Sequence, residues 1–510
     1  METVTISRTE YDLLVGEQAR LERQVEYLLE QMRLSRHRQY GASSEKSEYD
    51  HEQLNLFNEA EVMTGEPETE LVEIEKHYRK RTRLTTDKLP EDLPVDVIEH
   101  ELPENEQICC ECGGKLHVMN HDIRRELVII PAQLKIREHR RAVYSCRSCE
   151  VKNDHVPIQK AELPKPVIGG SFASPEAIAH IMVQKFVLGV PLYRQEQDWQ
   201  RQGILLSRQT MSNWLLKAAG SWLSPVYEGL KTELLEHEVL HADETTLQVL
   251  REPGKTAQSK SYMWLYRTGG DAVHPIVLYD YQTSRKSEHP KRFLDGWNGY
   301  LHADGYDGYH KLPEGIIVSG CWAHLRRKFD EGLKSLPESA REGSLALTGK
   351  RYCDRLFALE REFAVLPSEQ RYEKRLESSK PLVEEFFAWA DLCGAVPKSP
   401  VGKAVYYAFT QRKYLECFLL DGRLEISNNR AERSIKPFVI GRKNWLFANT
   451  PGGASASAMI YSIIETAKEN DINPYDYLMF VFENAPNWDL QSPDALQHLM
   501  PYNFKITAGA

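Results

Sequence analysis

The sequence has no uninterrupted apolar run of about 18 residues, and its first residues carry no charged-then-apolar signal pattern. We therefore expect neither a membrane span nor an export signal, and predict a cytoplasmic protein. Cysteine is scarce, at nine in 510 residues, which excludes a disulfide-stabilised scaffold. Five of the nine lie between positions 109 and 149, and this crowding favours a metal site over disulfide bridges.

The chain as a whole lacks a basic excess, since its formal charge is −10. Residues 45–75 alone hold eleven acids and one lysine, and their net −10 equals the charge of the entire chain. We interpret this run as part of a solvated acidic linker over 41–94 that has a basic end. The remainder is neutral on balance and contains local basic clusters, which makes a polyanionic partner a reasonable hypothesis.

The first segment, 1–40, has the seven-residue repeat of a helix that pairs with another helix. Leu14, Leu21 and Leu28 occupy one seam of this helix. The other seam holds Tyr11, Gln18, Val25 and Met32. The repeat predicts a leucine-zipper helix, and hence a homodimer or a higher oligomer. The alternative is a helix that packs on its own domain.

Two C-x-x-C pairs lie within 95–160. The four cysteines are Cys109, Cys112, Cys146 and Cys149. Four thiolates suit tetrahedral zinc at Zn–S distances of about 2.3 Å and leave no open position for catalysis. Between the pairs, residues 127–146 alternate in a way that predicts a hairpin. We predict a zinc ribbon with one structural zinc ion; the alternative is a set of reduced, inert cysteines.

Three short helices are predicted within 165–232. Ser174 caps a helix over 175–188, a second helix covers 191–202, and Ser207 caps a third. In the third helix the apolar residues recur at i, i+3, i+4 and i+7: Met211, Trp214, Leu215 and Ala218. Its outward face would present Arg208, Gln209, Ser212, Asn213 and Lys217 to DNA. The pattern is typical of a helix-turn-helix-like DNA-binding domain, and equally of tri-helical units that bind nothing.

From about residue 235 the pattern changes to strands. Strand-like runs at 238–250, 261–270 and 274–284 precede a helical run, a fourth strand and a strand–helix pair that ends near 329. This order matches an RNase H-like catalytic core. We assign the core to 235–335 and 425–470, a helical insertion to 336–424 and a C-terminal tail domain to 471–510. The predicted fold class is multidomain α/β.

Two aspartates interrupt strand-like runs, although aspartate is a poor β-former. Asp243 is expected where the first strand ends and Asp304 where the adjacent fourth strand ends, so their carboxylates would converge. A third acid, Glu432, lies in a capped helix start that a proline stops. Around it, phosphate contacts are expected from Arg430, Arg433, Lys436, Arg442 and Lys443. Glu244 and Asp307 are rivals for the first and second acids, and each acid alone is as well explained as a surface or capping residue.

Converging carboxylates would repel one another unless cations neutralise them. Two magnesium ions roughly 3.5–4 Å apart form the usual clamp for phosphodiester displacement, and manganese is an expected substitute. The pattern therefore predicts a two-metal site formed by Asp243, Asp304 and Glu432.

Several long motifs resemble one family, the IS-sixty-six (IS66) transposases of bacterial insertion sequences. They are HADET at 241–245, GYLHADGYDGY at 299–309, GCWAHLRRKF at 320–329 and SNNRAERSIKPFVIGRKNWLF at 427–447. The resemblance extends over nearly the whole chain, including YGASSEK at 40–46 and the tail to LMPYNF at 499–504. One departure is Cys110, where the family usually has proline.

The resemblance implies a DDE transposase whose triad carries over to Asp243, Asp304 and Glu432. Cys321 and His324 match a C-x-x-H element found after the second acid of many DDE enzymes. They are expected to be accessory residues; the alternative is a structural role, in strand-end packing and as a satisfied histidine. The family implies binding of double-stranded DNA at terminal inverted repeats, Mg-dependent strand cleavage and strand transfer, and small accessory transposition proteins. The resemblance therefore also implies a bacterial cytoplasmic protein that is associated with the nucleoid when it is bound to DNA. Two alternatives are an RNase H-like nuclease or resolvase, and a non-catalytic DNA-binding protein derived from a transposase.

Overall fold

The computed structural model describes residues 97–98, 133–145 and 158–504. The predicted zipper helix, the acidic linker and all four cysteines of the predicted zinc ribbon lie outside these residues. The chain divides into two compact units, and the described residues from 164 to 504 belong to one of them. No helix in the described part of the chain combines the length and apolar character of a membrane span.

The described residues of the smaller unit contain one antiparallel strand pair. Strand β1 (Val143–Ser145) pairs with β2 (Ile158–Lys160), with Tyr144 opposite Gln159. Of the hairpin predicted over 127–146, residues 133–142 form no strand and Val143–Ser145 pair with β2, which follows the second cysteine pair in the sequence. Residues 127–132 and 146 of that prediction lie outside the described residues.

The three predicted helices after the linker are confirmed as α4 (Pro175–Phe186), α5 (Leu192–Arg201) and α6 (Arg208–Ala218). The Ser174 hydroxyl accepts a hydrogen bond from the Ala177 N–H, and the Ser207 hydroxyl accepts one from Thr210. Both serines therefore cap helix starts, as predicted. A π-helical segment, Ala219–Leu223, joins α6 to α7 (Ser224–Leu234).

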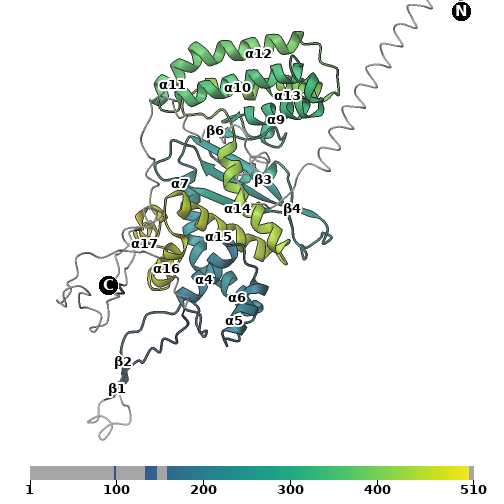
Figure 1. Ribbon diagram of the computed structural model, residues 1–510. Helices are drawn as coiled ribbons and strands as arrows, with labels where there is room; N and C mark the ends of the chain where they lie inside the picture. The colour runs from purple at the N-terminus through teal and green to yellow at the C-terminus, as the bar shows by residue number, and fades with distance from the viewer. Residues whose placement is uncertain (1–96, 99–132, 146–157, 505–510) are drawn as a thin grey trace, which may run out of the picture. The chain divides into compact units, whose positions relative to one another are not determined.

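A five-stranded mixed sheet forms the centre of the larger unit (Figure 1). Its strands are β3 (Val239–Gln248), β4 (Lys260–Thr268), β5 (Val277–Gln282), β6 (Gly299–His302) and β7 (Ile316–Ser319). Their spatial order is β5-β4-β3-β6-β7. The first three strands are antiparallel neighbours, whereas β6 runs parallel to both β3 and β7. Short α8 (Glu288–Phe293) lies between β5 and β6 in the sequence.

Helices α14 (Asn429–Trp445) and α15 (Pro451–Glu469) pack on this sheet. Helix α14 crosses β3 and β4 (Figure 1), and α15 packs against the edge strand β5. The Ser462 hydroxyl accepts the Tyr279 N–H at 2.8 Å, and the Thr466 hydroxyl bonds both backbone groups of Val277 at 3.0 Å. These contacts occupy backbone groups that an edge strand would otherwise present to solvent.

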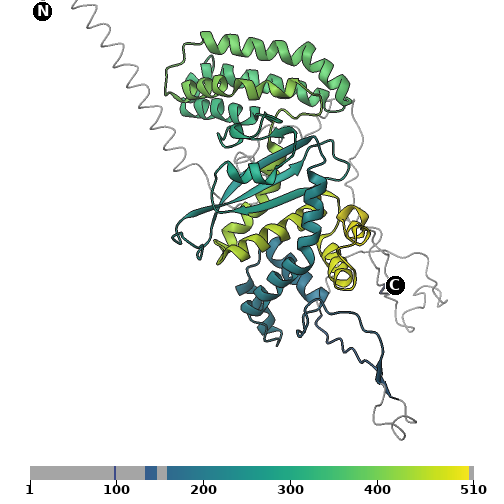
Figure 2. The same ribbon diagram turned by 180° about the vertical axis from the view of Figure 1, so that it is seen from behind.

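A helical region with its own apolar core follows β7 and precedes α14 (Figure 2). Its helices are α9 (Trp322–Ser335), α10 (Leu345–Phe363), α11 (Ser368–Lys374), α12 (Lys380–Leu392) and α13 (Pro400–Leu415). The largely helical stretch predicted for 345–420 is thus confirmed. The last α-helices among the described residues are α16 (Pro474–Asn484) and α17 (Pro493–His498).

Candidate active site

The same tripeptide, His-Ala-Asp, occurs in both parallel strands that meet at the centre of the sheet. It spans residues 241–243 on β3 and 302–304 at the end of β6. The register pairs His241 with His302, which is the last residue of β6. Because the two tripeptides are in register, Asp243 and Asp304 leave the parallel pairing at the same level.

The expectation that Asp243 ends its strand is wrong. Strand β3 continues to Gln248, and Asp243 pairs with Leu265 of β4. Only the parallel pairing with β6 ends, at His241. Asp243 therefore has a full strand on one side and an open position on the other, where Asp304 follows β6.

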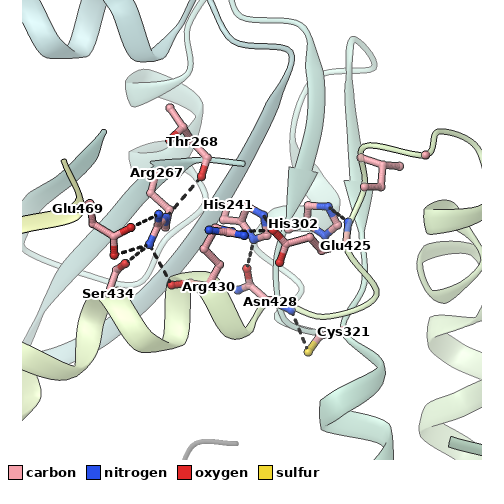
Figure 3. Close-up of polar contacts among 12 residues, drawn as sticks. His241, Arg267, Thr268, His302, Cys321, Glu425, Asn428, Arg430, Ser434 and Glu469 are labelled. Carbon is pink, nitrogen blue, oxygen red and sulfur yellow. Dashed lines mark hydrogen bonds and ion pairs between the residues drawn. The ribbon is translucent and has the colours of Figure 1, made fainter. Parts of the chain in front are cut away.

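The two histidines stack in the interior. Both rings are fully buried, with centroids 4.3 Å apart and planes 18° apart. The side-chain N–H of Asn428 donates to the Ala242 carbonyl at 2.8 Å, so its Oδ1 is the acceptor that lies 3.0 Å from His241 Nδ1. The Glu425 N–H donates to His302 Nε2 at 3.1 Å (Figure 3). Burial, followed by nearby positive charges, lowers the pKa of His241 well below its usual value, so this ring is neutral.

This network fixes the beginning of α14, which carries Glu432. Asn428 occupies the N-cap position, but its side chain bonds the sheet and makes no cap hydrogen bond. Figure 3 also shows Arg267 of β4, fully buried, reaching Ser434 of α14 and Glu469 of α15, with a 2.7 Å ion pair to Glu469. The sheet thus holds α14 at both Asn428 and Ser434.

The predicted stop at Pro437 is wrong, because α14 continues through this proline to Trp445. A proline inside a helix removes one backbone hydrogen bond. The next turn nevertheless buries Phe438 and Gly441. A Cβ at Gly441 would lie 2.4 Å from the Tyr461 hydroxyl of α15, so the two helices approach closely there. Tertiary packing therefore extends the helix past the local break.

The three predicted acids influence one another's charge. Burial, together with Glu244, Asp304 and Glu432, raises the pKa of Asp243 well above its usual value. Burial raises the pKa of Glu432 to about 7; Asp304 also raises it, while Arg327 opposes the rise. Arg327 Nη2 donates to Glu432 Oε2 at 3.4 Å. The fold therefore brings carboxylates from β3, from the end of β6 and from α14 into one electrostatic cluster, in which Asp304 raises the pKa of both other acids.

The rival acids lie in different surroundings. Glu244 is buried, with Oε1 accepting from Arg285 Nε at 2.6 Å and Oε2 accepting from the Tyr309 hydroxyl at 2.6 Å. Both of its oxygens are therefore occupied. The side chain of Asp307 is 83% exposed and lies 3.9 Å from His310.

Cys321 and His324 lie at the beginning of α9, beside Glu432. Cys321 is the N-cap residue and is fully buried, and His324 is in the first turn. His324 Nδ1 is 3.6 Å from Glu432 Oε1. The Asn428 backbone N–H donates to Cys321 Sγ at 3.2 Å, which links this turn to the start of α14.

The predicted DNA-binding residues divide into two groups by their surroundings. In α6 the buried residues are the four predicted, Met211, Trp214, Leu215 and Ala218. Of the five predicted outward residues, Ser212 is half-buried and the other four are exposed. In α14, Arg430 pairs with Glu425 at 2.6 Å, and Arg442 donates to Thr245 and Thr246 at 3.2 Å. Arg433 and Lys443 are exposed, and Lys436 is half-buried.

Sequence reasoning missed His241, His302, Asn428 and the two arginines that face the acids, Arg285 and Arg327. The repeated His-Ala-Asp tripeptide was an available signal for the histidines, since equal spacing on parallel strands predicts that they meet. No local pattern indicated the arginines. Arg285 lies in the loop after β5, and Arg327 points from α9 across to α14.

Comparison with known families matches four segments of the chain. The model described as "Transposase IS66 family" matches residues 170–456, and the "zinc-finger binding domain of transposase IS66" matches 106–150. The "IS66 C-terminal element" matches 462–502, and "Transposase C of IS166 homeodomain" matches 27–98. These matches support the predicted leucine-zipper and zinc-finger segments. The zinc-finger match also supports binding of zinc and of DNA.

Similar proteins occur in Sinorhizobium fredii. The uncharacterized protein y4qI is 34% identical over 431 residues, which are 81% of this chain and 76% of the relative. The uncharacterized protein y4jD is 31% identical over 434 residues, covering 82% of this chain and 81% of the relative. Together with the four segment matches, these similarities show that the chain belongs to the IS66 family of transposases.

Proposed function

We propose that this protein is a two-metal DDE transposase with an RNase H-like core, which cleaves and joins DNA at the ends of an insertion sequence. The observation that carries the proposal is the cluster of Asp243, Asp304 and Glu432, three acids from separate elements. Besides burial, Asp304 raises the pKa of both Asp243 and Glu432. The strand order β5-β4-β3-β6-β7, with three antiparallel strands followed by two parallel ones, supports the core assignment.

The donor set fits a hard divalent cation. All three side chains offer carboxylate oxygens, which Mg²⁺ and Mn²⁺ prefer. Asp243, Asp304 and Glu432 would together hold two such ions. When bound, the cations supply charge stabilisation for in-line displacement at phosphorus.

The protein's own residues would orient the reaction. The stacked histidines and Asn428 hold both aspartate strands and the start of α14 in a single arrangement. Such a preorganised set of charges lowers the barrier because little rearrangement is needed as the transition state forms. Arg285, 3.9 Å from Asp304, and Arg327 at Glu432 place positive charge at the edge of the cluster, where DNA phosphates would approach.

Recognition of the terminal inverted repeats would come from the zinc ribbon and from the polar face of α6. Phosphate contacts by basic residues of α6 and α14 would make this binding steeply dependent on salt. We further propose that the zipper helix brings two element ends together as a dimer or a higher oligomer.

A strand-transfer assay with pre-cleaved element ends and Mg²⁺ tests the proposal. Asp304→Asn should abolish joining while leaving binding to the ends nearly unchanged, and Asp307→Asn is the matched control that should stay active. Joining that survives Asp304→Asn would refute the assignment. Cleavage without joining in the unmodified protein would identify a nuclease or resolvase, and binding without either reaction would identify a non-catalytic DNA-binding protein.

A further inference from the structure

Three side chains of different chemistry meet beside the carboxylate cluster. Among the residues that the structure describes, Cys321, His324 and Glu432 form the one group of three metal-ligating residues whose donor atoms all lie within 4.8 Å of one another. The group contains a thiol, an imidazole and a carboxylate. A tetrahedral ion with ligands at 2.0–2.3 Å would place the donor atoms roughly 3.5 Å apart. Nδ1 of His324 and Oε1 of Glu432 are already 3.6 Å apart.

The backbone fixes all three positions. Cys321 and His324 are three residues apart at the start of α9, a spacing that places both on the same side of the first turn. The Trp322 N–H donates to the Ile426 carbonyl at 3.1 Å, and the Asn428 N–H donates to Cys321 Sγ at 3.2 Å. These bonds tie the first turn of α9 to the segment that leads into α14 and Glu432.

Two of the donor atoms lack a hydrogen-bond partner. Nδ1 of His324 and Oε1 of Glu432 are both buried without one. Leaving one such polar atom buried and unpaired costs about 1–3 kcal/mol. A cation bound between them would give both atoms a partner.

We propose that Cys321, His324 and Glu432 bind a zinc ion, distinct from the zinc of the N-terminal ribbon. A thiolate with an imidazole suits zinc and excludes magnesium as the preferred occupant, because soft sulfur ligands select borderline and soft cations. Three protein ligands leave a fourth position for water or for a ligand that arrives with DNA. The Cys321 proton is released to solvent on binding, since the thiolate is the ligating form.

Glu432 would then belong to two sites. A carboxylate has two oxygens with about four lone-pair directions, so it can contact the zinc ion through Oε1 and one of the proposed magnesium ions as well. The zinc ion would hold Glu432 in position for that second role. The proposal goes beyond the transposase mechanism and does not need it, because zinc binding is measurable in the absence of DNA and of magnesium.

Zinc content of the purified full-length protein, dialysed against Mg²⁺ without chelator, tests the proposal. We expect two zinc ions per chain in the unmodified protein. Cys321→Ser and His324→Ala should each retain one, because they lose the proposed site. Cys146→Ser should also retain one, because it loses the zinc of the ribbon. Cys353→Ser is the matched control, since Cys353 is another fully buried cysteine on the neighbouring α10. It should retain two. His324→Cys, which keeps a ligand, should also retain two.

Substitution by Co²⁺ supplies a second readout. Cys146→Ser, with its ribbon disrupted, should still show a thiolate-to-cobalt charge-transfer band that disappears when Cys321→Ser is added. Zinc content that is equal in the unmodified protein, Cys321→Ser and His324→Ala would overturn the proposal. Asp304→Asn should keep both zinc ions while losing strand joining, so failure of the transposase mechanism and failure of the zinc site are distinguishable.

Discussion

The two faces of strand β3 carry adjacent acids with opposite fates. Glu244 faces Arg285 and Tyr309, and each of its oxygens accepts a hydrogen bond of 2.6 Å. Asp243 faces the side covered by α14, and its Oδ1 accepts the backbone N–H of Glu244 at 2.8 Å. Besides burial, the acids Glu244, Asp304 and Glu432 all raise its pKa, and no arginine is among the causes. Burial is therefore not what distinguishes a chemically available acid from a structural one. The difference is whether the surroundings already satisfy the carboxylate.

Paired substitutions on the two faces give the largest expected contrast. Asp243→Asn should reduce strand joining by at least about 1000-fold, because loss of a metal-binding carboxylate removes several kcal/mol of transition-state stabilisation. Glu244→Gln should reduce joining by less than about tenfold. Rates measured with pre-cleaved ends at saturating Mg²⁺ decide between them. The reverse order of effects would assign the first catalytic acid to Glu244.

The burial of Glu432 beside other acids should make stability depend on pH. The folded-state pKa of Glu432 is about 7, above its unfolded value, so its contribution to stability is complete at low pH and is lost as pH rises through 7. In metal-free protein, Glu432→Gln should be more stable than the unmodified chain at pH 8, by on the order of 3 kcal/mol, and the difference should vanish near pH 4. Thermal unfolding of the two proteins across this range measures it.

Divalent cation provides the control for this pH effect. Adding Mg²⁺ at pH 8 should stabilise the unmodified protein and have a smaller effect on Glu432→Gln, because the variant carries one negative charge fewer in the cluster. If the unmodified protein is more stable than Glu432→Gln at pH 8 without metal, ionised Glu432 does not destabilise the fold and the explanation is wrong.

Much of the fold followed from sequence patterns that act locally. Ser174 and Ser207 cap helices where predicted, and the apolar face of α6 is the one that its spacing indicates. Strand-like runs separated by turns identified each strand of the sheet. These elements were predictable because caps and periodicity depend on neighbours in the sequence.

Other features depended on partners distant in the sequence. Helix α14 passes through Pro437 because Phe438 and Gly441 pack against the sheet and α15, which outweighs one lost hydrogen bond. Asp243 lies within a strand because β4 is longer than β6. The hydrogen bond from Arg285 to the Glu244 carboxylate could not be predicted either, because the two residues are 41 positions apart in the sequence.

Asn428 offers a test of the positioning network on the α14 side. Asn428→Ala removes its hydrogen bonds to His241 and to the Ala242 carbonyl and leaves both buried groups unpaired. We expect a loss of about 1–3 kcal/mol in unfolding free energy, with a lower joining rate at unchanged affinity for DNA ends. Asn444→Ala, at an exposed position of the same helix, is the control and should change neither quantity. If the two variants have the same unfolding free energy and the same joining rate, Asn428 does not position the active site.

The smallest expected effect concerns the DNA-facing side of α6. Lys217 is exposed, so Lys217→Ala should leave stability unchanged. If it contacts a phosphate, the variant should bind element ends more weakly and lower the slope of log affinity against log salt by about 1. Lys217→Arg keeps the charge and should keep the slope. An unchanged slope in Lys217→Ala would exclude this contact.

The most direct test of the central claim is the position of bound Mn²⁺ in crystals of the protein with its DNA ends, found from anomalous scattering. We predict manganese peaks within about 2–2.3 Å of carboxylate oxygens from Asp243, Asp304 and Glu432, with Glu244 making no contact. Manganese bound elsewhere while these three carboxylates hold none would contradict the account.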